Sequence, residues 1–251
     1  MASLDVNWAE RASSGSVYTL VTIVCLTLGG WLWSRRFRNE SGSFAVFVGA
    51  IAGAYLGAKL LYLAAEGWMH CGIDLWLYQL AAGKTIVGAL LGGYAGVEIA
   101  KKLIGYAKPT GDWFAVGVPL SIAAGRLGCL RYGCCPGKVC AKPGWFTITD
   151  RAGVERWPAV PLELGFNLLF IVMILPLVLR RKVLENSPFA GQLFHLYLIS
   201  YGAFRFWHEF HRDTPTVLFG LSGYQLGAVA LICLGSLRGI SRSRKNKAQP
   251  S

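Results

Sequence analysis

Long apolar runs alternate with short segments rich in basic and polar residues along nearly the whole chain. A helix needs roughly 20 apolar residues to cross the hydrocarbon core of a bilayer. Several runs come close to that length, and glycines within them are compatible with membrane helices. The pattern predicts an all-α integral membrane protein with about seven transmembrane helices. They are expected near residues 16–34, 44–65, 75–99, 112–128, 161–179, 192–210 and 217–236.

The composition agrees with a membrane protein. The chain is 54% hydrophobic and only 15% charged, whereas a soluble domain carries about 25% charged residues. The net charge of +12 would also suit a nucleic-acid-binding protein. Here the basic residues form clusters between apolar runs, so a nucleic-acid partner is not expected.

Basic residues gather after every second apolar run, and the opposite loop 66–74 has Glu66 and Asp74 but no Lys or Arg. Because short cytoplasmic loops of membrane proteins are enriched in Lys and Arg, the N-terminus is expected outside and the C-terminus inside. The chain is expected to be one polytopic domain, 1–251, with an outside loop at 129–157 and a basic cytoplasmic tail at 237–251. A loop of that length is often functional. The clusters are Arg35, Arg36 and Arg38; Lys101, Lys102 and Lys108; Arg180, Arg181 and Lys182; and Arg238, Arg242, Arg244, Lys245 and Lys247.

Ionisable residues within the predicted spans share one half of the bilayer. At 1.5 Å per residue, Arg126, Arg205 and Lys59 lie roughly 21 Å from the inner face, and Lys84 lies about 14 Å from the outer face. Such residues are costly in a membrane and indicate function, although a Lys near a helix end can simply snorkel to the surface. With Tyr18 and Glu163 at the outer ends of their spans, they predict an outer-half polar cavity.

The sixth span carries Tyr201, Arg205 and Glu209 at intervals of four, and therefore on one helix face. Arg before Glu is the weaker order for supporting a helix. The guanidinium fork of Arg matches phosphate and carboxylate oxygens. The stripe can therefore hold an anionic ligand, or else form an ion pair between helices.

Four strings in this chain resemble bacterial prolipoprotein diacylglyceryl transferases. They are GSVYTL with Tyr18, GAYLGAKLLY with Lys59, GRLGCLRYGCCPG, which is similar to the family signature G-R-x-G-N-x-x-x-G-E-x-x-G, and YGAFRFWHEFHR, which is similar to Y-G-x-x-R-F-x-x-E-x-x-R. A later Gln225, in LSGYQLG, also fits the family pattern. The resemblance runs in order through all the predicted spans.

The resemblance implies a reaction at the outer leaflet of the bacterial plasma (inner) membrane. The diacylglyceryl group of phosphatidylglycerol moves to a cysteine thiol of a lipoprotein precursor, and glycerol phosphate leaves. Neither a metal nor a soluble cofactor is implied. Arg126, Arg205 and Glu209 become catalytic candidates. The candidates for substrate binding are Tyr18, Lys59, Lys84, Gly128, Gly137, Tyr201 and Gln225.

The chain departs from the family where a thiol would be activated. Val87 stands in place of a family His, Cys129 in place of the signature Asn, Cys134 in place of the signature Glu, and Glu163 in place of a Gln. Lys84, Glu209 or a loop Cys thiolate then remain as alternatives for the base. The alternative function is a catalytically altered paralogue that binds lipid or senses redox state, or that uses another acceptor.

Four cysteines form the pattern C-x₄-C-C-x₄-C between residues 129 and 140. They can form disulfides in an oxidising outer compartment. They can also supply a reactive thiol beside Arg126, since a nearby cation lowers a thiol pKa; Cys129 and Cys134 are the catalytic candidates. Zinc is the third alternative, although this spacing differs from the usual zinc pairs.

Overall fold

The computed structural model describes residues 8–67, 83–135, 137–141, 144, 146–180, 184 and 189–248, with the backbone alone for residues 8–19, 132 and 244–248. Within these ranges the chain forms seven long helices and two short antiparallel hairpins. The helices are α1 (Trp8–Arg36), α2 (Ser43–Ala65), α4 (Ile86–Ile104), α5 (Gly111–Tyr132), α6 (Ala159–Leu179), α8 (Leu193–Glu209) and α9 (Gly223–Ala248). The strands are β1 (Ile148–Thr149), β2 (Glu155–Arg156), β3 (Thr216–Leu218) and β4 (Leu221–Ser222).

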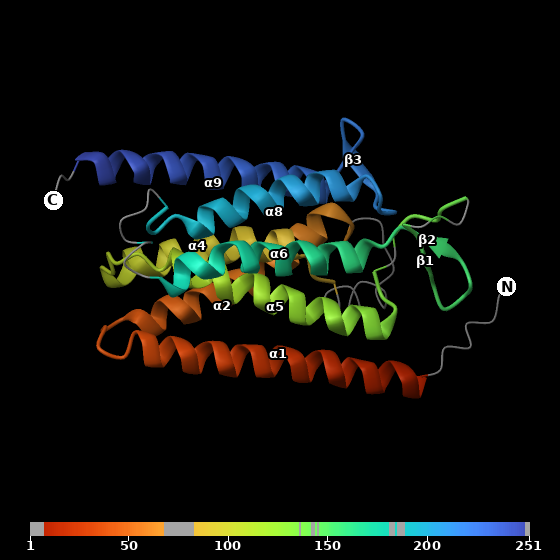
Figure 1. Ribbon diagram of the computed structural model, residues 1–251, viewed down its shortest axis with the longest axis horizontal. Coiled ribbons are helices and arrows are strands. Elements are labelled where there is room, and N and C mark those ends of the chain that lie inside the picture. Colours follow the sequence, from red (N-terminus) through yellow and green to blue (C-terminus); the bar gives the residue numbers. More distant parts are fainter. Residues whose placement is uncertain are drawn as a thin grey trace.

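The helices lie side by side with their long axes roughly aligned, and successive helices run in opposite directions (Figure 1). Both hairpins lie at one end of the bundle, which we call the strand-bearing end. The turn between α1 and α2 and the C-terminal end of α9 lie at the opposite end. Arg35 and Arg36 close α1, and Lys101 and Lys102 close α4. The predicted basic clusters that the structure describes therefore lie at one end of the bundle.

Among the residues that the structure describes, four helices are long and apolar enough to cross a membrane. The chain is an integral membrane protein with a mostly helical fold, and a total of seven crossings remains a prediction. Helix α8 is not one of the four, because Leu193–Glu209 contains only 17 residues, fewer than the roughly 20 that a crossing needs. The four spans are Ser43–Ala65, Gly111–Arg131, Ala159–Leu179 and Gly223–Ser243.

Two predicted span boundaries are wrong. The third span was expected at 75–99, but α4 begins after Thr85, whose backbone is extended at φ −127° and ψ 137°, and continues to Ile104; positions 75–82 lie outside the described residues. The seventh was expected at 217–236, but β3 and β4 pair there. Phe219 and Gly220 have positive φ angles of 50° and 72°, which reverse the chain instead of continuing a helix.

Two predicted loop boundaries also shift. The outside loop was expected to begin at residue 129, but α5 continues to Tyr132 and ends at Gly133, whose φ is 71°. Glycine reaches this left-handed conformation without strain, which makes it a common helix terminator. The segment 237–248, predicted as a basic tail, is the last part of α9.

Helices α2 and α4 pack through glycine on both sides. A Cβ atom at Gly92 would lie 2.2 Å from the carbonyl oxygen of Gly53, and one at Gly96 would lie 2.1 Å from that of Gly49. Gly57 and Gly88 meet in the same way, at 2.3 Å. Small residues at intervals of four allow membrane helices to approach closely and to gain backbone van der Waals contact. This interface fixes α2 and α4 as one wall of the bundle.

Candidate functional site

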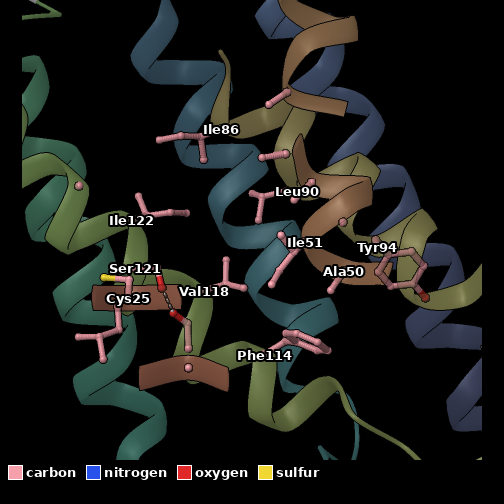
Figure 2. Close-up of a pocket in the computed structure, with 18 of the residues that line it drawn as sticks. Cys25, Ala50, Ile51, Ile86, Leu90, Tyr94, Phe114, Val118, Ser121 and Ile122 are labelled. Atoms are coloured by element: carbon pink, nitrogen blue, oxygen red, sulfur yellow. Dashed lines mark hydrogen bonds between the residues drawn. The ribbon is translucent and has the colours of Figure 1, made fainter. Parts of the chain in front are cut away.

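A cavity of about 2020 Å³ extends along the bundle between α1, α2, α4 and α5, with contributions from α8 and α9. Its middle section is largely apolar. Figure 2 shows Ile51, Leu90, Phe114 and Val118 among the side chains that line it. At the strand-bearing end its lining becomes cationic and thiol-rich, with Arg126, Cys129, Cys134, Cys135, Arg205 and Arg212. Lys101, Arg238 and Arg242 line its opposite end, so the cavity joins an apolar middle to charged regions at both ends, and only the strand-bearing one also contains thiols of Cys129, Cys134 and Cys135.

A network of buried charges surrounds Glu163 of α6 at this end. Its Oε2 lies 2.7 Å from Nη2 of Arg126 on α5 and 3.6 Å from Nη1 of Arg205 on α8. Tyr201 Oη donates a hydrogen bond of 2.6 Å to Glu163 Oε1. Nη2 of Arg205 also lies 2.8 Å from Oε2 of Glu209. Glu163 is fully buried, and both arginines are less than 10% exposed, so each charge requires a partner.

The two arginines and two glutamates of this network balance in formal charge. Arg212 follows α8 and adds a further positive charge to the same cavity. Its Nε and Nη1 atoms are buried without a hydrogen-bond partner among the described residues, as is Nε of Arg126. Buried donors of this kind are costly unless something accepts from them. The pocket is thus suited to an anion with several oxygens.

A second group of side chains holds the Glu163 network in place. Asn167 Nδ2 donates to the Glu163 carbonyl oxygen at 2.7 Å, and Tyr197 Oη donates to Asn167 Oδ1 at 2.7 Å. Nδ1 of His208 lies 3.5 Å from Nη1 of Arg205. The sequence interpretation did not select Asn167, Tyr197, His208 or Arg212. The spacing of four between Glu163 and Asn167, and between Tyr197 and Tyr201, was the available signal, because it places each pair on one helix face.

The two predicted lysines lie together but apart from these contacts. Nζ of Lys59 and Nζ of Lys84 lie 6.0 Å and 5.8 Å from the centroid of the Tyr55 ring. Lys84 was expected inside the third span. It instead lies outside the helix, before α4 begins, and it is exposed where it lines the cavity. Lys84 lies outside the helix because α4 begins later in the chain than predicted.

The remaining predicted binding residues have different surroundings. Gly128 lines the cavity. A Cβ atom at Gly137 would lie 2.3 Å from the Trp157 carbonyl oxygen, so this glycine permits a close loop contact. Gln225 accepts a 2.9 Å hydrogen bond from the Ser222 backbone N–H at the start of α9. Tyr18 lies on α1, and its side chain is outside the described residues.

Three cysteines meet where α5 ends. The backbone N–H groups of Gly133 and Cys134 both donate to the Cys129 carbonyl oxygen, at 2.9 and 3.3 Å, and Cys135 has a positive φ of 59°. This turn places the sulfur atoms of Cys129, Cys134 and Cys135 within 4.8 Å of one another. Cys129, predicted in the loop, lies on the last turn of α5 instead. Cys140 is outside the group and donates to the Lys138 carbonyl oxygen at 3.9 Å.

The electrostatic surroundings of the two loop thiols differ. Hydrogen bonds from Cys129 and Cys134, with the nearby Arg126 and Arg212 guanidinium groups, hold the pKa of Cys135 below its usual range. Hydrogen bonds to Cys129 and Cys135, with burial, raise the pKa of Cys134. One thiolate stabilised by its two neighbours is therefore favoured. The six described cysteines are all free thiols.

The position of the expected histidine is apolar. Val87 on α4 is fully buried, and its Cγ1 atom would lie 2.8 Å from a Cβ atom at Gly227. It belongs to the apolar core with Leu90 and Leu231.

Comparison with known sequences identifies the family. The sequence profile of prolipoprotein diacylglyceryl transferases matches residues 13–239. The chain belongs to this family.

Similar curated relatives come from diverse bacteria, and each is named a phosphatidylglycerol–prolipoprotein diacylglyceryl transferase. One from Dehalococcoides mccartyi is 28% identical over 260 residues, covering 98% of this chain and 93% of the relative. One from Clostridium tetani is 31% identical over 186 residues, covering 72% of each protein. One from Geobacter sulfurreducens is 31% identical over 209 residues, covering 80% of this chain and 77% of the relative. No solved structure gives a significant match. The chain is thus a transferase-family membrane protein.

Proposed function

We propose that this protein transfers the diacylglyceryl group of phosphatidylglycerol to a cysteine thiol of a lipoprotein precursor at the outer leaflet. The observation that carries the proposal is the continuity between the apolar middle of the cavity and the arginines at its strand-bearing end. Acyl chains fit the first part, and a phosphodiester fits the second. The names of the relatives supply the chemistry of the donor and the acceptor.

The arginines suit the bond that must break. A thiolate attacks the glycerol carbon that bears the phosphodiester, an S–C bond forms, and the C–O bond breaks. Glycerol phosphate leaves with the electron pair and one additional negative charge. Arg126 and Arg205 are buried donors held by ion pairs, and together with Arg212 they can stabilise that developing charge. Glu163 and Glu209 hold Arg126 and Arg205 in place.

The proposed orientation places the strand-bearing end outside and the C-terminus in the cytoplasm. Arg35, Arg36, Lys101 and Lys102 end their helices at the opposite end of the bundle. The positive-inside tendency favours the cytoplasm for that end. The charged pocket then lies near the depth of outer-leaflet headgroups, where it can meet both the lipid donor and an exported precursor.

Purified full-length protein in phosphatidylglycerol vesicles tests the proposal. With a lipobox peptide added, we expect release of glycerol phosphate and a peptide heavier by one diacylglyceryl group. A peptide with Ser in place of its Cys is the matched control and should give neither product. If the Cys peptide also gives neither, the proposed transfer is wrong.

A catalytically altered paralogue is the second candidate, favoured by the apolar Val87 and the three clustered thiols. Such a protein would bind phosphatidylglycerol in the same cavity without turnover, and oxidation of the thiols would change lipid binding. Lipid mass spectrometry of the purified protein, before and after mild oxidation, separates it from the enzyme.

A further inference from the structure

We propose that Cys129, Cys134 and Cys135 bind one zinc ion, and that its open fourth position takes the acceptor thiol. This inference rests on the proposed function and specifies how its acceptor is activated. The three sulfur atoms lie within 4.8 Å of one another. Two sulfurs on one tetrahedral zinc lie about 3.8 Å apart, given Zn–S bonds of about 2.3 Å. Side-chain rotation at the half-buried Cys134 and Cys135 can close the difference.

The local fold at the end of α5 brings the three cysteines together, although their spacing in the sequence differs from that of usual zinc ligands. Cys129 is on the last turn of α5, and the left-handed Gly133 and Cys135 turn the chain back over it. The Cys134 N–H to Cys129 carbonyl contact of 3.3 Å fixes this return. The end of helix α5 therefore brings Cys129 and Cys134 together, in place of the loop that usually holds a pair of zinc ligands.

The number of protein ligands favours a reactive site over a structural one. Structural zinc sites have four protein ligands, whereas catalytic sites have three and an open position. Within the described residues the group has three sulfur ligands, and Cys140 is not part of it. All three cysteines line the cavity, so the fourth position faces the volume that would hold the substrate.

The charge of the site is matched by its neighbours. Zinc with three thiolates carries one net negative charge. Nη1 of Arg126 lies 3.8 Å from Sγ of Cys129, and its Nη2 contacts Glu163. Arg126 therefore lies between the thiol cluster and the proposed phosphate pocket. An outer-shell cation of this kind orients and tunes the metal ligands.

Zinc at this site would activate the acceptor thiol, for which the chain lacks the family histidine that Val87 replaces. A thiol that coordinates zinc is deprotonated, and its proton passes to solvent. The zinc-bound sulfur then attacks the glycerol carbon beside Arg126, the S–C bond forms, and the C–O bond to phosphate breaks. The thioether is a weaker ligand than a thiolate and dissociates. No oxidation or reduction occurs in this sequence.

Metal analysis of the full-length protein in vesicles provides the direct test. We expect about one zinc per chain, in line with a three-ligand catalytic site, and its loss in Cys129→Ser, Cys134→Ser and Cys135→Ser. Cys140→Ser, from the same loop, is the matched control and should keep its zinc. Zinc retained in all three variants, or no zinc binding in the unmodified protein, would overturn the inference.

Cobalt substitution tests the open position without a variant that must fold. The unmodified protein loaded with Co²⁺ should show thiolate-to-metal charge-transfer absorption, and the lipobox peptide should increase it by adding a fourth sulfur. The Ser-containing peptide should not. A spectrum unchanged by the Cys peptide, or a disulfide among the three cysteines in active protein, contradicts the proposal.

Activity distinguishes this inference from the proposed function. Chelation of zinc should lower transfer about 100-fold, the contribution of a positioned proton acceptor, and zinc should restore it. Full transfer by the metal-free protein would sink the zinc site while leaving the transferase function intact. Zinc binding by the three cysteines with no transfer under any condition would sink the transferase function, and with it the acceptor role of the zinc site.

Discussion

Two interfaces hold this bundle together by different means. Between α2 and α4, glycines bring the backbones so close that a Cβ at Gly92 would lie 2.2 Å from a carbonyl oxygen. Between α5, α6 and α8, Arg126, Glu163 and Arg205 form a buried ionic network. The first interface gains only packing, whereas the second retains charges at a high desolvation cost. The difference supports the proposal that the α2–α4 interface is structural and that the α5–α6–α8 interface contributes the chemistry.

Gly92→Leu should disrupt the α2–α4 interface and cause the largest loss of the four predicted changes. The side chain would collide with the α2 backbone, which cannot move as a flexible side chain can. We expect a loss above about 3 kcal/mol, beyond ordinary overpacking, seen as little or no monodisperse protein after purification. Gly165→Ala on α6 is the control, because a Cβ there meets nothing within 4 Å. Normal yield of Gly92→Leu would show that the close contact is unnecessary.

Arg205→Ala should disrupt the ionic network between α5, α6 and α8 and lower turnover. Removing one preorganised donor to a developing anion lowers turnover by roughly 10²- to 10³-fold. The change also leaves Glu209 without its 2.8 Å partner, so thermal unfolding should be followed alongside glycerol phosphate release. Arg205→Lys retains the charge without the fork and should recover only part of the rate. Full turnover by Arg205→Ala would contradict the proposed mechanism.

Glu163→Gln should separate effects on stability from effects on lipid binding. Gln can keep the Tyr201 contact but removes the carboxylate charge that faces Arg126 and Arg205. We expect a lower melting temperature without lipid, corresponding to about 1–3 kcal/mol. The freed positive charge should lower the KM for phosphatidylglycerol. A raised KM would mean that the positioning of the arginines by Glu163 matters more for lipid binding than its competition with phosphate.

Lys84→Ala should have the smallest effect of the four. The ammonium is exposed near the Tyr55 ring, and an exposed cation contributes about 0.5–1 kcal/mol in such a setting. Phosphatidylglycerol binding to protein in neutral-lipid nanodiscs should weaken about two- to fivefold, the equivalent of that energy. Lys102→Ala at the opposite end should leave binding unchanged. Equal losses in both would indicate a general surface-charge effect.

Much of the fold was accessible from the sequence. Apolar runs indicate which segments are helical, and the basic clusters between them predict which helix ends lie on the same side of the bundle. The boundary at Gly223 was missed because Thr216–Leu218 is apolar without being helical, and the boundary at Thr85 was missed because the non-helical residues 83–85 lie between two apolar stretches of the sequence. Hydropathy reports the preference of side chains for lipid, whereas the pairing of β3 with β4 and the extended Thr85 depend on backbone hydrogen bonds and dihedral angles.

The sequence alone predicts that Arg126 and Arg205 lie on two helices at similar depth, because helical rise fixes position along an axis. Rotation of each helix about its axis was left open, and only packing decided it. Packing placed Glu163 between both arginines, added Arg212 to the cavity, and kept Val87 in the apolar core. It also gathered Cys129, Cys134 and Cys135 at one helix end. Contacts between distant segments depend on the fit of whole helix surfaces, and a linear pattern does not contain that information.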